Sequence, residues 1–291
     1  MKLVSVLVDG VRRAGVVDGD RIGVDPRPGG LDAVLATDGV VRPERFVPWD
    51  GAHLDAPLRP PVVFCVGQNY ADHLEEKAPV HRPEPEFFLK AGQTIAAPDE
   101  PALLDPRVTA KLDYETELGV VIGRAGRAIS EADAWDHVFG YVALNDLTAR
   151  DRQVVIHPDG TQSMALGPGK NFDGSTRMGR LVITADEVGD PTDLALITLV
   201  DGQPRQQNST RNLISSIPEI LAFVSRMLTL QPGSVIATGT PGGTGWGMDA
   251  QLGGTSQVPE GCLPASYLVP GQLVEGRIGP LIAYDFRVVA G

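Results

Sequence analysis

The chain has 291 residues with 42% hydrophobic and 21% charged side chains, the balance of an ordinary globular protein. Its formal net charge of −12, without a cluster of Lys and Arg, argues against a nucleic-acid partner. No apolar run is long enough to span a bilayer, and two isolated cysteines exclude a cysteine-based zinc site and a disulfide framework, so we expect a cytoplasmic protein without a membrane partner.

The N-terminal region reads as a series of short strands. Frequent glycine (34) and proline (24) with few aromatic residues indicate strands and turns rather than a helical bundle. Asp9-Gly10 and Asp18-Gly19 are hairpin turn signals that separate expected strands at residues 3–8, 14–17 and 21–24. Because a proline-rich step follows at residues 57–61, we predict a small β-rich domain over residues 1–60 and a second domain over residues 61–291.

A reactive pair follows the next expected strand, residues 62–67. We predict that Asn69 caps a short helix that carries His73 and Glu76, which are three residues apart and therefore share a helix face. A carboxylate bound to an imidazole fixes its tautomer and raises its basicity, which gives a general base able to activate water. Spacing alone favours the alternative, a surface pair on a solvated helix.

Two glutamates are the most informative feature of the sequence. Glu115 and Glu117 precede an apolar run that predicts a buried strand closed by Gly123. Side chains two apart in a strand share a face, so the two carboxylates would repel each other and resist desolvation. A hard divalent cation with oxygen ligands would neutralise them. The alternative is that the two glutamates lie on the solvated face of an edge strand. Without further signals in the sequence, the spacing of the pair favours this alternative.

Further polar residues occur at expected strand and helix ends. A strand near residues 141–145 ends at Asp146, which could supply a third carboxylate or simply cap a helix, and Arg150 follows one turn later. Ser130 with Asp133 predicts a helix near residues 131–138. The clearest helix, residues 217–228, begins with a capping box of Ser216 and Glu219 and has one apolar stripe, so it is scaffold.

Two glycine-rich segments complete the set. Residues 167–173 place Lys170 in a loop, where its ammonium could meet a substrate carboxylate or enolate. Residues 235–245 read as a buried strand that runs into a turn, whose backbone N–H groups could hold a carboxylate or oxyanion. Each of these signals is weak by itself.

Taken together, the segments resemble the fumarylacetoacetate hydrolase family. Five motifs occur in the family's order within residues 61–286: residues 66–73, 112–123, 145–151, 170–173 and 237–245. The resemblance implies a mainly β fold with short helices (α+β), in which a β-sandwich or β-roll catalytic domain follows a small N-terminal β domain. It also implies a homodimer.

The resemblance also implies a set of site residues. Mg²⁺ or Mn²⁺ (or Ca²⁺ in a crystal) would bind two glutamates and an aspartate and chelate the 2-keto acid end of a small-molecule substrate. A His/Glu pair on a lid helix would activate water, and a lysine would stabilise the enolate. The matching residues are Glu115, Glu117 and Asp146 for the metal, His73, Glu76 and Lys170 for catalysis, and Tyr70, Arg150, Gln153 and Thr240 for substrate binding.

The leading hypothesis is therefore a metal-dependent hydrolase that cleaves a C–C bond of an acylpyruvate or other 2,4-dioxo acid. The alternative is an isomerase or decarboxylase of a related 2-keto diacid, of the 2-hydroxyhepta-2,4-diene-1,7-dioate or oxaloacetate type. A second alternative is a non-catalytic β-rich binding module. The sequence departs from the family where residues 174–179 lack a usual proline and where residues 248–265 are inserted, so substrate identity and the role of the insertion stay open.

Overall fold

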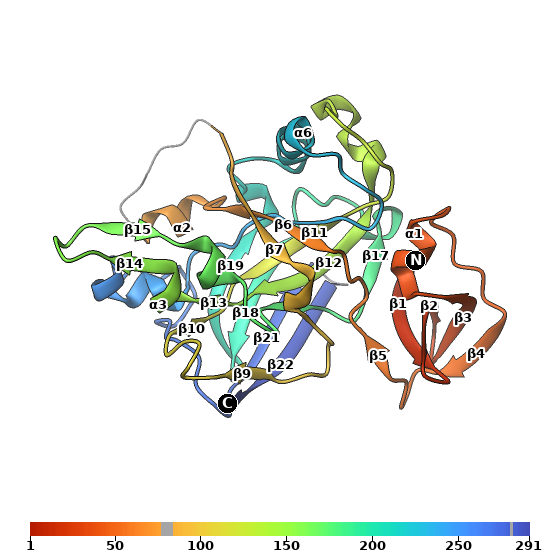
Figure 1. The fold of residues 1–291 in the computed structure, drawn as a ribbon, viewed down its shortest axis with the longest axis horizontal. Coiled ribbons are helices and arrows are strands. Elements are labelled where there is room, and N and C mark those ends of the chain that lie inside the picture. The colour runs from red at the N-terminus through yellow and green to blue at the C-terminus, as the bar shows by residue number, and fades with distance from the viewer. Residues whose placement is uncertain (77–83, 280–281) are drawn as a thin grey trace.

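Two β-sheets form the body of the protein (Figure 1). The computed structural model describes residues 1–76, 84–279 and 282–291. The larger sheet has the strand order β4-β3-β2-β1-β17-β12-β11-β20-β6-β7, and the smaller has the order β19-β18-β21-β22-β9. The prediction of a mainly β fold with short helices is confirmed. Within the described residues, no helix is long and apolar enough to cross a membrane.

The N-terminal unit is a run of hairpins with its own apolar cluster. At the first turn, Asp9 and Gly10 both have positive φ, 53° and 73°, which is the backbone of a two-residue hairpin. β1 also pairs with β17, so the unit continues the larger sheet, and the boundary near residue 60 stays a prediction. The elements of this unit are β1 (Lys2–Val8), β2 (Val11–Asp18), β3 (Arg21–Pro28), α1 (Gly30–Leu35), β4 (Arg45–Pro48) and β5 (Leu54–Asp55).

The remaining strands of the larger sheet surround β11, the strand that contains Glu117. Its neighbours β12 and β20 are both antiparallel to it, whereas β6 runs parallel to β20. The expected strand at residues 62–67 is confirmed as β6. These strands are β6 (Val62–Gly67), β7 (Glu86–Ala91), β8 (Ile95–Ala96), β11 (Thr116–Ile122), β12 (Val138–Asp146), β16 (Thr176–Met178), β17 (Val182–Thr184) and β20 (Val235–Ala237).

The smaller sheet packs on one face of the larger one through the main apolar core. Its strands are β9 (Ala102–Leu104), β18 (Ala195–Val200), β19 (Gln203–Ser209), β21 (Leu273–Ile278) and β22 (Ile282–Ala290). Two short ladders lie apart from both sheets, and one of them, β14–β15, projects from the body (Figure 1). Their strands are β10 (Leu112–Asp113), β13 (Thr148–Ala149), β14 (Val154–Ile156) and β15 (Gln162–Met164).

The helices are short, as expected from the composition. α6 begins with the predicted capping box, in which the Ser216 hydroxyl accepts from the Glu219 N–H and the Glu219 carboxylate accepts from the Ser216 N–H. The expected helix near residues 131–138 is a 3-10 helix capped by Ser130. The α-helices beyond α1 are α2 (Ala71–Glu75), α3 (Arg150–Gln153), α4 (Leu166–Lys170), α5 (Ala185–Val188) and α6 (Ile217–Met227); the 3-10 helices are η1 (Gly92–Thr94), η2 (Glu131–His137), η3 (Thr210–Asn212), η4 (Gly245–Met248) and η5 (Ala250–Leu252).

Side chains alternate between the two faces of β11, so one face packs in the core and the other carries the polar site. Leu118, Val120 and Ile122 pack in the core shared with the smaller sheet, whereas Val121 belongs to the cluster on the opposite face. Glu117 has the same parity as Val121 and therefore points away from the smaller sheet. Glu115 lies just before the strand and continues this alternation.

The predicted helix cap at Asn69 is wrong. Its amide is 2% exposed and reaches outside α2, where it donates to the carbonyl oxygens of Ser215 (3.1 Å) and Thr238 (2.9 Å). The side-chain oxygen Oδ1 of Asn69 accepts from the Ser215 N–H at 2.7 Å. Asn69 therefore joins the end of β6 to the segment before α6 and to the end of β20, which sequence spacing alone does not reveal.

Replacing Asn69 should test this link. Asn69→Ala leaves buried backbone groups without partners, so we expect the free energy of unfolding to fall by about 2 kcal/mol. Urea denaturation followed by circular dichroism measures the change. Asn212→Ala, at an exposed asparagine, is the matched control. A shift for Asn69→Ala as small as that of the control would show that the link does not stabilise the fold.

Candidate active site

Three buried carboxylates meet where β11 and β12 lie side by side. Glu115, Glu117 and Asp146 each offer one oxygen, and these oxygens lie within 4.8 Å of one another. The two strands pair with Thr116 opposite Asn145, and the Asp146 N–H donates to the Glu115 carbonyl oxygen at 2.9 Å. The backbone ladder therefore fixes the spacing of the carboxylates. The structure brings together all three predicted metal ligands.

Two ammonium groups bind this cluster from the side of β7 and α4. Lys170 Nζ lies 2.5 Å from Glu115 Oε2 and 2.7 Å from Asp146 Oδ2. Lys90 Nζ contacts the other oxygen of Asp146 and lies 2.7 Å from the Ser175 carbonyl oxygen. The predicted glycine-rich loop around Lys170 is instead the short helix α4. Lys90 was not predicted.

The cations are unevenly distributed around the cluster, so the pKa values of Glu115 and Glu117 shift in opposite directions. Burial would raise the pKa of Glu115, but the charges of Lys170 and Arg150 outweigh it and hold this pKa well below its usual range. Burial and the charges of Asp146 and Glu115 together raise the pKa of Glu117 well above its usual value. Among the contacts of the described residues, Glu117 accepts from the Gly239 N–H at 2.7 Å and from no cation.

This donor set fits a divalent cation. Three carboxylates are the hard oxygen ligands that Mg²⁺ and Mn²⁺ prefer. A cation in contact with Glu117 would also remove the repulsion that raises its pKa. The fit supports the predicted metal class and does not distinguish Mg²⁺, Mn²⁺ and Ca²⁺.

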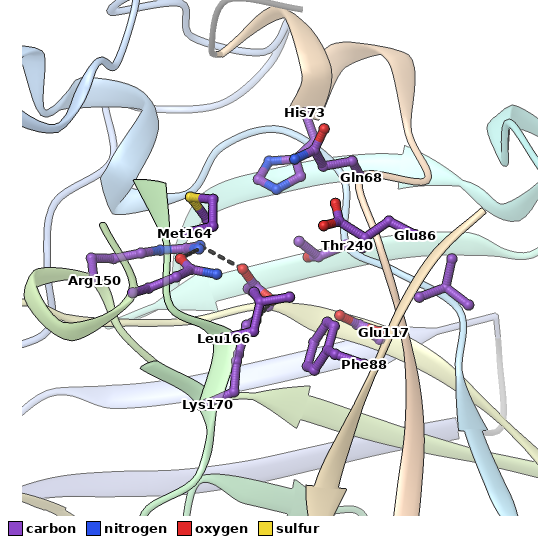
Figure 2. Close-up of a pocket in the computed structure, with 14 residues that line it drawn as sticks. Gln68, His73, Glu86, Phe88, Glu117, Arg150, Met164, Leu166, Lys170 and Thr240 are labelled. Atoms are coloured by element: carbon purple, nitrogen blue, oxygen red, sulfur yellow. Dashed lines mark hydrogen bonds and ion pairs between the residues drawn. The ribbon is translucent and has the colours of Figure 1, made fainter. Parts of the chain in front are cut away.

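His73 and Glu76 form a buried pair, and His73 lines a cavity that Glu115, Glu117 and Lys170 also line. His73 Nδ1 lies 2.8 Å from Glu76 Oε2, and Figure 2 shows the imidazole directed into the cavity. Burial raises the pKa of Glu76, but the hydrogen bond from His73 and the N–H of Gly243 outweigh it and lower this pKa. Glu76 is thus a carboxylate acceptor, which places the imidazole proton on Nδ1 and makes Nε2 the proton-accepting nitrogen.

The turn after β20 binds carboxylates of the protein itself. The N–H groups of Gly243 and Thr244 donate to Glu76 Oε1, at 2.6 and 3.1 Å. Those of Gly245 and Trp246 donate to Asp113, at 2.7 and 3.0 Å. The sequence predicted correctly that this glycine-rich turn holds carboxylates. It did not reveal that they are internal side chains rather than a substrate group.

Asp113 in turn fixes Arg150. Arg150 Nε donates to Asp113 at 2.7 Å, and its Nη2 donates to Glu115 at 2.5 Å. Its Nη1 donates to Gln153 at 2.7 Å, and the guanidinium lies 4.9 Å from the centre of the Trp246 ring. Arg150 therefore presents a rigid, fully oriented cation at the edge of the carboxylate cluster.

The predicted substrate-binding residues fall into two groups. Arg150, Gln153 and Thr240 line the cavity, together with His73, Lys170 and the metal-site glutamates Glu115 and Glu117 (Figure 2). Tyr70 is not among the residues that line the cavity, and its wholly buried side chain has a hydroxyl without a hydrogen-bond partner in the described residues.

Other cavity residues escaped the sequence reasoning. Glu86 and Phe88 line the cavity on β7, and the buried Lys90 follows two positions later (Figure 2). This period of two is a detectable signal once residues 86–91 are assigned to a strand. Gln68 has a positive φ of 54°, and Met164 and Leu166 complete the apolar side of the wall.

Comparisons with known proteins establish the family. The sequence model of the fumarylacetoacetate (FAA) hydrolase C-terminal domain matches residues 62–289, so the chain belongs to this family. The oxaloacetate tautomerase YisK of Bacillus subtilis is 36% identical over 232 residues, which span 78% of this chain and 70% of that protein.

Two solved structures extend the likeness over the whole chain. A fumarylacetoacetate hydrolase of Exiguobacterium antarcticum superposes with a TM-score of 0.81 and 33% identity, and each chain is covered completely. A maleylpyruvate hydrolase of Sphingobium sp. SYK-6, in complex with manganese(II) and pyruvate, superposes with a TM-score of 0.72 and 27% identity, again with complete coverage of both chains. The chain is therefore an enzyme of this family, and its relatives include hydrolases and a tautomerase.

Removing one carboxylate should separate charge repulsion from metal binding. In Glu117→Gln, the metal-free protein loses a buried repulsion, so its melting temperature should equal or exceed that of the wild type. Mn²⁺ at about 100 times its Kd should stabilise the wild type by about 2.7 kcal/mol, and the variant should lose this gain. Thermal melts with and without Mn²⁺ measure both effects.

The control is Glu131→Gln, at an exposed glutamate, which should keep the full response to Mn²⁺. An unchanged Mn²⁺ response in Glu117→Gln would exclude Glu117 as a ligand.

Proposed function

We propose that the protein is a Mg²⁺- or Mn²⁺-dependent isomerase that interconverts the keto and enol forms of an oxaloacetate-type 2-keto diacid. The observation that carries the proposal is the buried His73–Glu76 pair, whose His73 lines the same cavity as Glu115 and Glu117 of the carboxylate cluster. Such an arrangement puts a proton-transfer group beside a site for an anionic oxygen. Similarity to the tautomerase of B. subtilis favours this reaction over the hydrolysis first expected from the sequence.

The conversion of the keto form to the enol needs two proton transfers, one from the substrate to His73 and one from His73 back to the substrate. His73 Nε2 takes a proton from C3 of the keto form, so the C3–H bond breaks, its electron pair forms the C2–C3 double bond, and the π pair of the C2=O bond moves onto the oxygen to give the enolate. The imidazolium then delivers the proton to the C2 oxygen, which completes the enol and restores neutral His73. Glu76 stays ionised throughout and holds the Nδ1 proton, because its oxygens already accept hydrogen bonds.

The cations around the cavity bind and orient the substrate. When bound, Mg²⁺ or Mn²⁺ would supply the Lewis acid that polarises the keto oxygen. Arg150 is held by Asp113 and Gln153, so it can receive a substrate carboxylate without reorganising. Burial would lower the pKa of Lys170, but Asp146 and Glu115 outweigh it and raise this pKa, so Lys170 acts as a permanent positive charge and not as a base.

Hydrolysis of an acylpyruvate is the second candidate. The hydrolase of E. antarcticum matches this chain over its whole length, and the His73–Glu76 pair could take a proton from water as well as from carbon. Substrate choice would then decide the reaction. A homodimer also stays a prediction, which analytical ultracentrifugation would test.

A panel of substrates with and without Mn²⁺ tests the proposal. The panel contains enol-oxaloacetate, acetylpyruvate, fumarylpyruvate and 2-hydroxyhepta-2,4-dienedioate. We expect metal-dependent ketonisation of enol-oxaloacetate to have the highest kcat/KM, and His73→Ala to lower it by at least about 100-fold. The decay of enol absorbance measures the first reaction, and separation of products by chromatography measures C–C cleavage.

The control is His53→Ala, at an exposed histidine of the N-terminal unit, which should keep full activity. Faster cleavage of an acylpyruvate than ketonisation would favour the hydrolase. Ketonisation that survives in His73→Ala would remove this residue from the mechanism, and no metal-dependent turnover on any substrate would contradict both candidates.

A further inference from the structure

Residues 248–265, which the sequence indicates are inserted relative to the family motifs and which are here called the brace, contact both the scaffold and the helix that carries His73. The sequence left their role open. The first part of the brace contacts both regions through hydrogen bonds from a few residues. These contacts show how the insertion could act on the site without lining its cavity.

One side of the brace is fixed to the scaffold. Asp249 Oδ2 lies 2.6 Å from Lys111 Nζ and accepts from the Tyr267 hydroxyl at 2.7 Å. The Leu252 carbonyl oxygen accepts from the indole N–H of Trp246 at 2.8 Å, and the Leu252 side chain packs with the same indole. A partly buried ion pair and an apolar contact therefore hold residues 249–252 in one position.

The other side of the brace holds the end of α2. The Thr255 N–H donates to the Glu76 carbonyl oxygen at 3.1 Å, and the Thr255 hydroxyl donates to the Glu75 carbonyl oxygen at 2.9 Å. The last carbonyl groups of an α-helix have no partner inside the helix. With five residues, α2 is also far too short to be stable alone. External contacts must therefore hold it in place.

α2 and the residue after it carry the proposed proton-transfer pair. His73 lies within α2, and Glu76 caps its end, so any displacement of the helix end changes the 2.8 Å contact between them. Gly247, the residue just before the brace, also passes close to Glu76, since a Cβ added there would lie 2.5 Å from Glu76 Oε1. The backbone of Glu76 and its side chain are thus both fixed from this part of the chain.

We propose that Thr255 is a positioning residue, through which the brace holds α2 so that His73 and Glu76 are aligned before substrate binds. The proposal rests on the proposed proton transfer by His73, and it gives the insertion a function that the family motifs do not include. Since Thr255 does not line the cavity, its loss should reduce kcat and leave KM nearly unchanged.

The test combines hydrogen–deuterium exchange with kinetics of the Mn²⁺-loaded enzyme. Thr255→Val keeps the shape and removes the hydroxyl donor, whereas Thr255→Ser keeps the donor. In Thr255→Val we expect the Leu74 N–H of α2 to exchange about two- to ten-fold faster and kcat to fall by a similar factor, the range for loss of one hydrogen bond. Thr255→Ser should restore both values.

Two further variants sharpen the result. Asp249→Asn weakens the fixed side of the brace without touching α2, so it should also speed exchange in α2. Thr37→Val is the matched control, because the Thr37 hydroxyl donates to the Val34 carbonyl oxygen at 2.9 Å near the end of α1, in the N-terminal unit. It should change neither exchange in α2 nor kcat.

The outcomes separate this proposal from the proposed function. Unchanged exchange of the Leu74 N–H in Thr255→Val would overturn the positioning role, whatever the substrate proves to be. An equal effect of Thr37→Val would overturn it as well. If the wild type turned over no substrate of the panel, the proposed function would fail, and exchange alone would still decide whether the brace holds α2.

Discussion

Buried negative charge is the constraint around which this molecule is arranged. The site contains five buried carboxylates, of which Glu115 and Glu117 line the cavity: Glu76, Asp113, Glu115, Glu117 and Asp146. Lys90, Arg150 and Lys170 bind some of them, and the backbone N–H groups of residues 239–246 bind the others. The glycines of that turn permit the close approach, since a Cβ on Gly239 would lie 2.8 Å from that of Asn69. Of the three clustered carboxylates Glu115, Glu117 and Asp146, Glu117 is the one without a cation among its contacts in the described residues, so a metal ion bound there would supply the missing positive charge.

Within the proposed proton-transfer pair, the surroundings of Glu76 and His73 give the two residues different roles. Glu76 accepts from His73, from two backbone N–H groups and from the Thr244 hydroxyl, so its oxygens are fully engaged. A carboxylate held in this way orients the imidazole and does not itself exchange protons with substrate. In the proposed mechanism, His73 is the group that both removes and returns the proton. The same division would suit removal of a proton from carbon and from water, so it is compatible with both candidate reactions.

The sequence predicted the parts of the site that depend on local periodicity. Alternation placed Glu115 and Glu117 on one face, helix spacing paired His73 with Glu76, and the capping box fixed the start of α6. Contacts between distant segments were not predictable in this way. Lys90 reaches Asp146 across 56 positions, and Asn69 reaches Ser215 across 146, so no local pattern records either contact. Tyr70 shows the opposite case, since its place in a motif suggested a role in substrate binding, yet its buried side chain is not among those that line the cavity.

The pairing of β1 with β17 has a consequence for the solubility of the folded chain. β17 is hydrogen-bonded on one side to β12, the strand that ends at Asp146, and on the other side to β1 through Lys2 and Leu3. The first strand of the chain thus covers what would otherwise be an open edge of the central sheet. An open edge presents unpaired N–H and C=O groups that recruit strands from other molecules. A chain trimmed of its first strand would therefore be prone to aggregate through β17, even with every residue of the cavity in place.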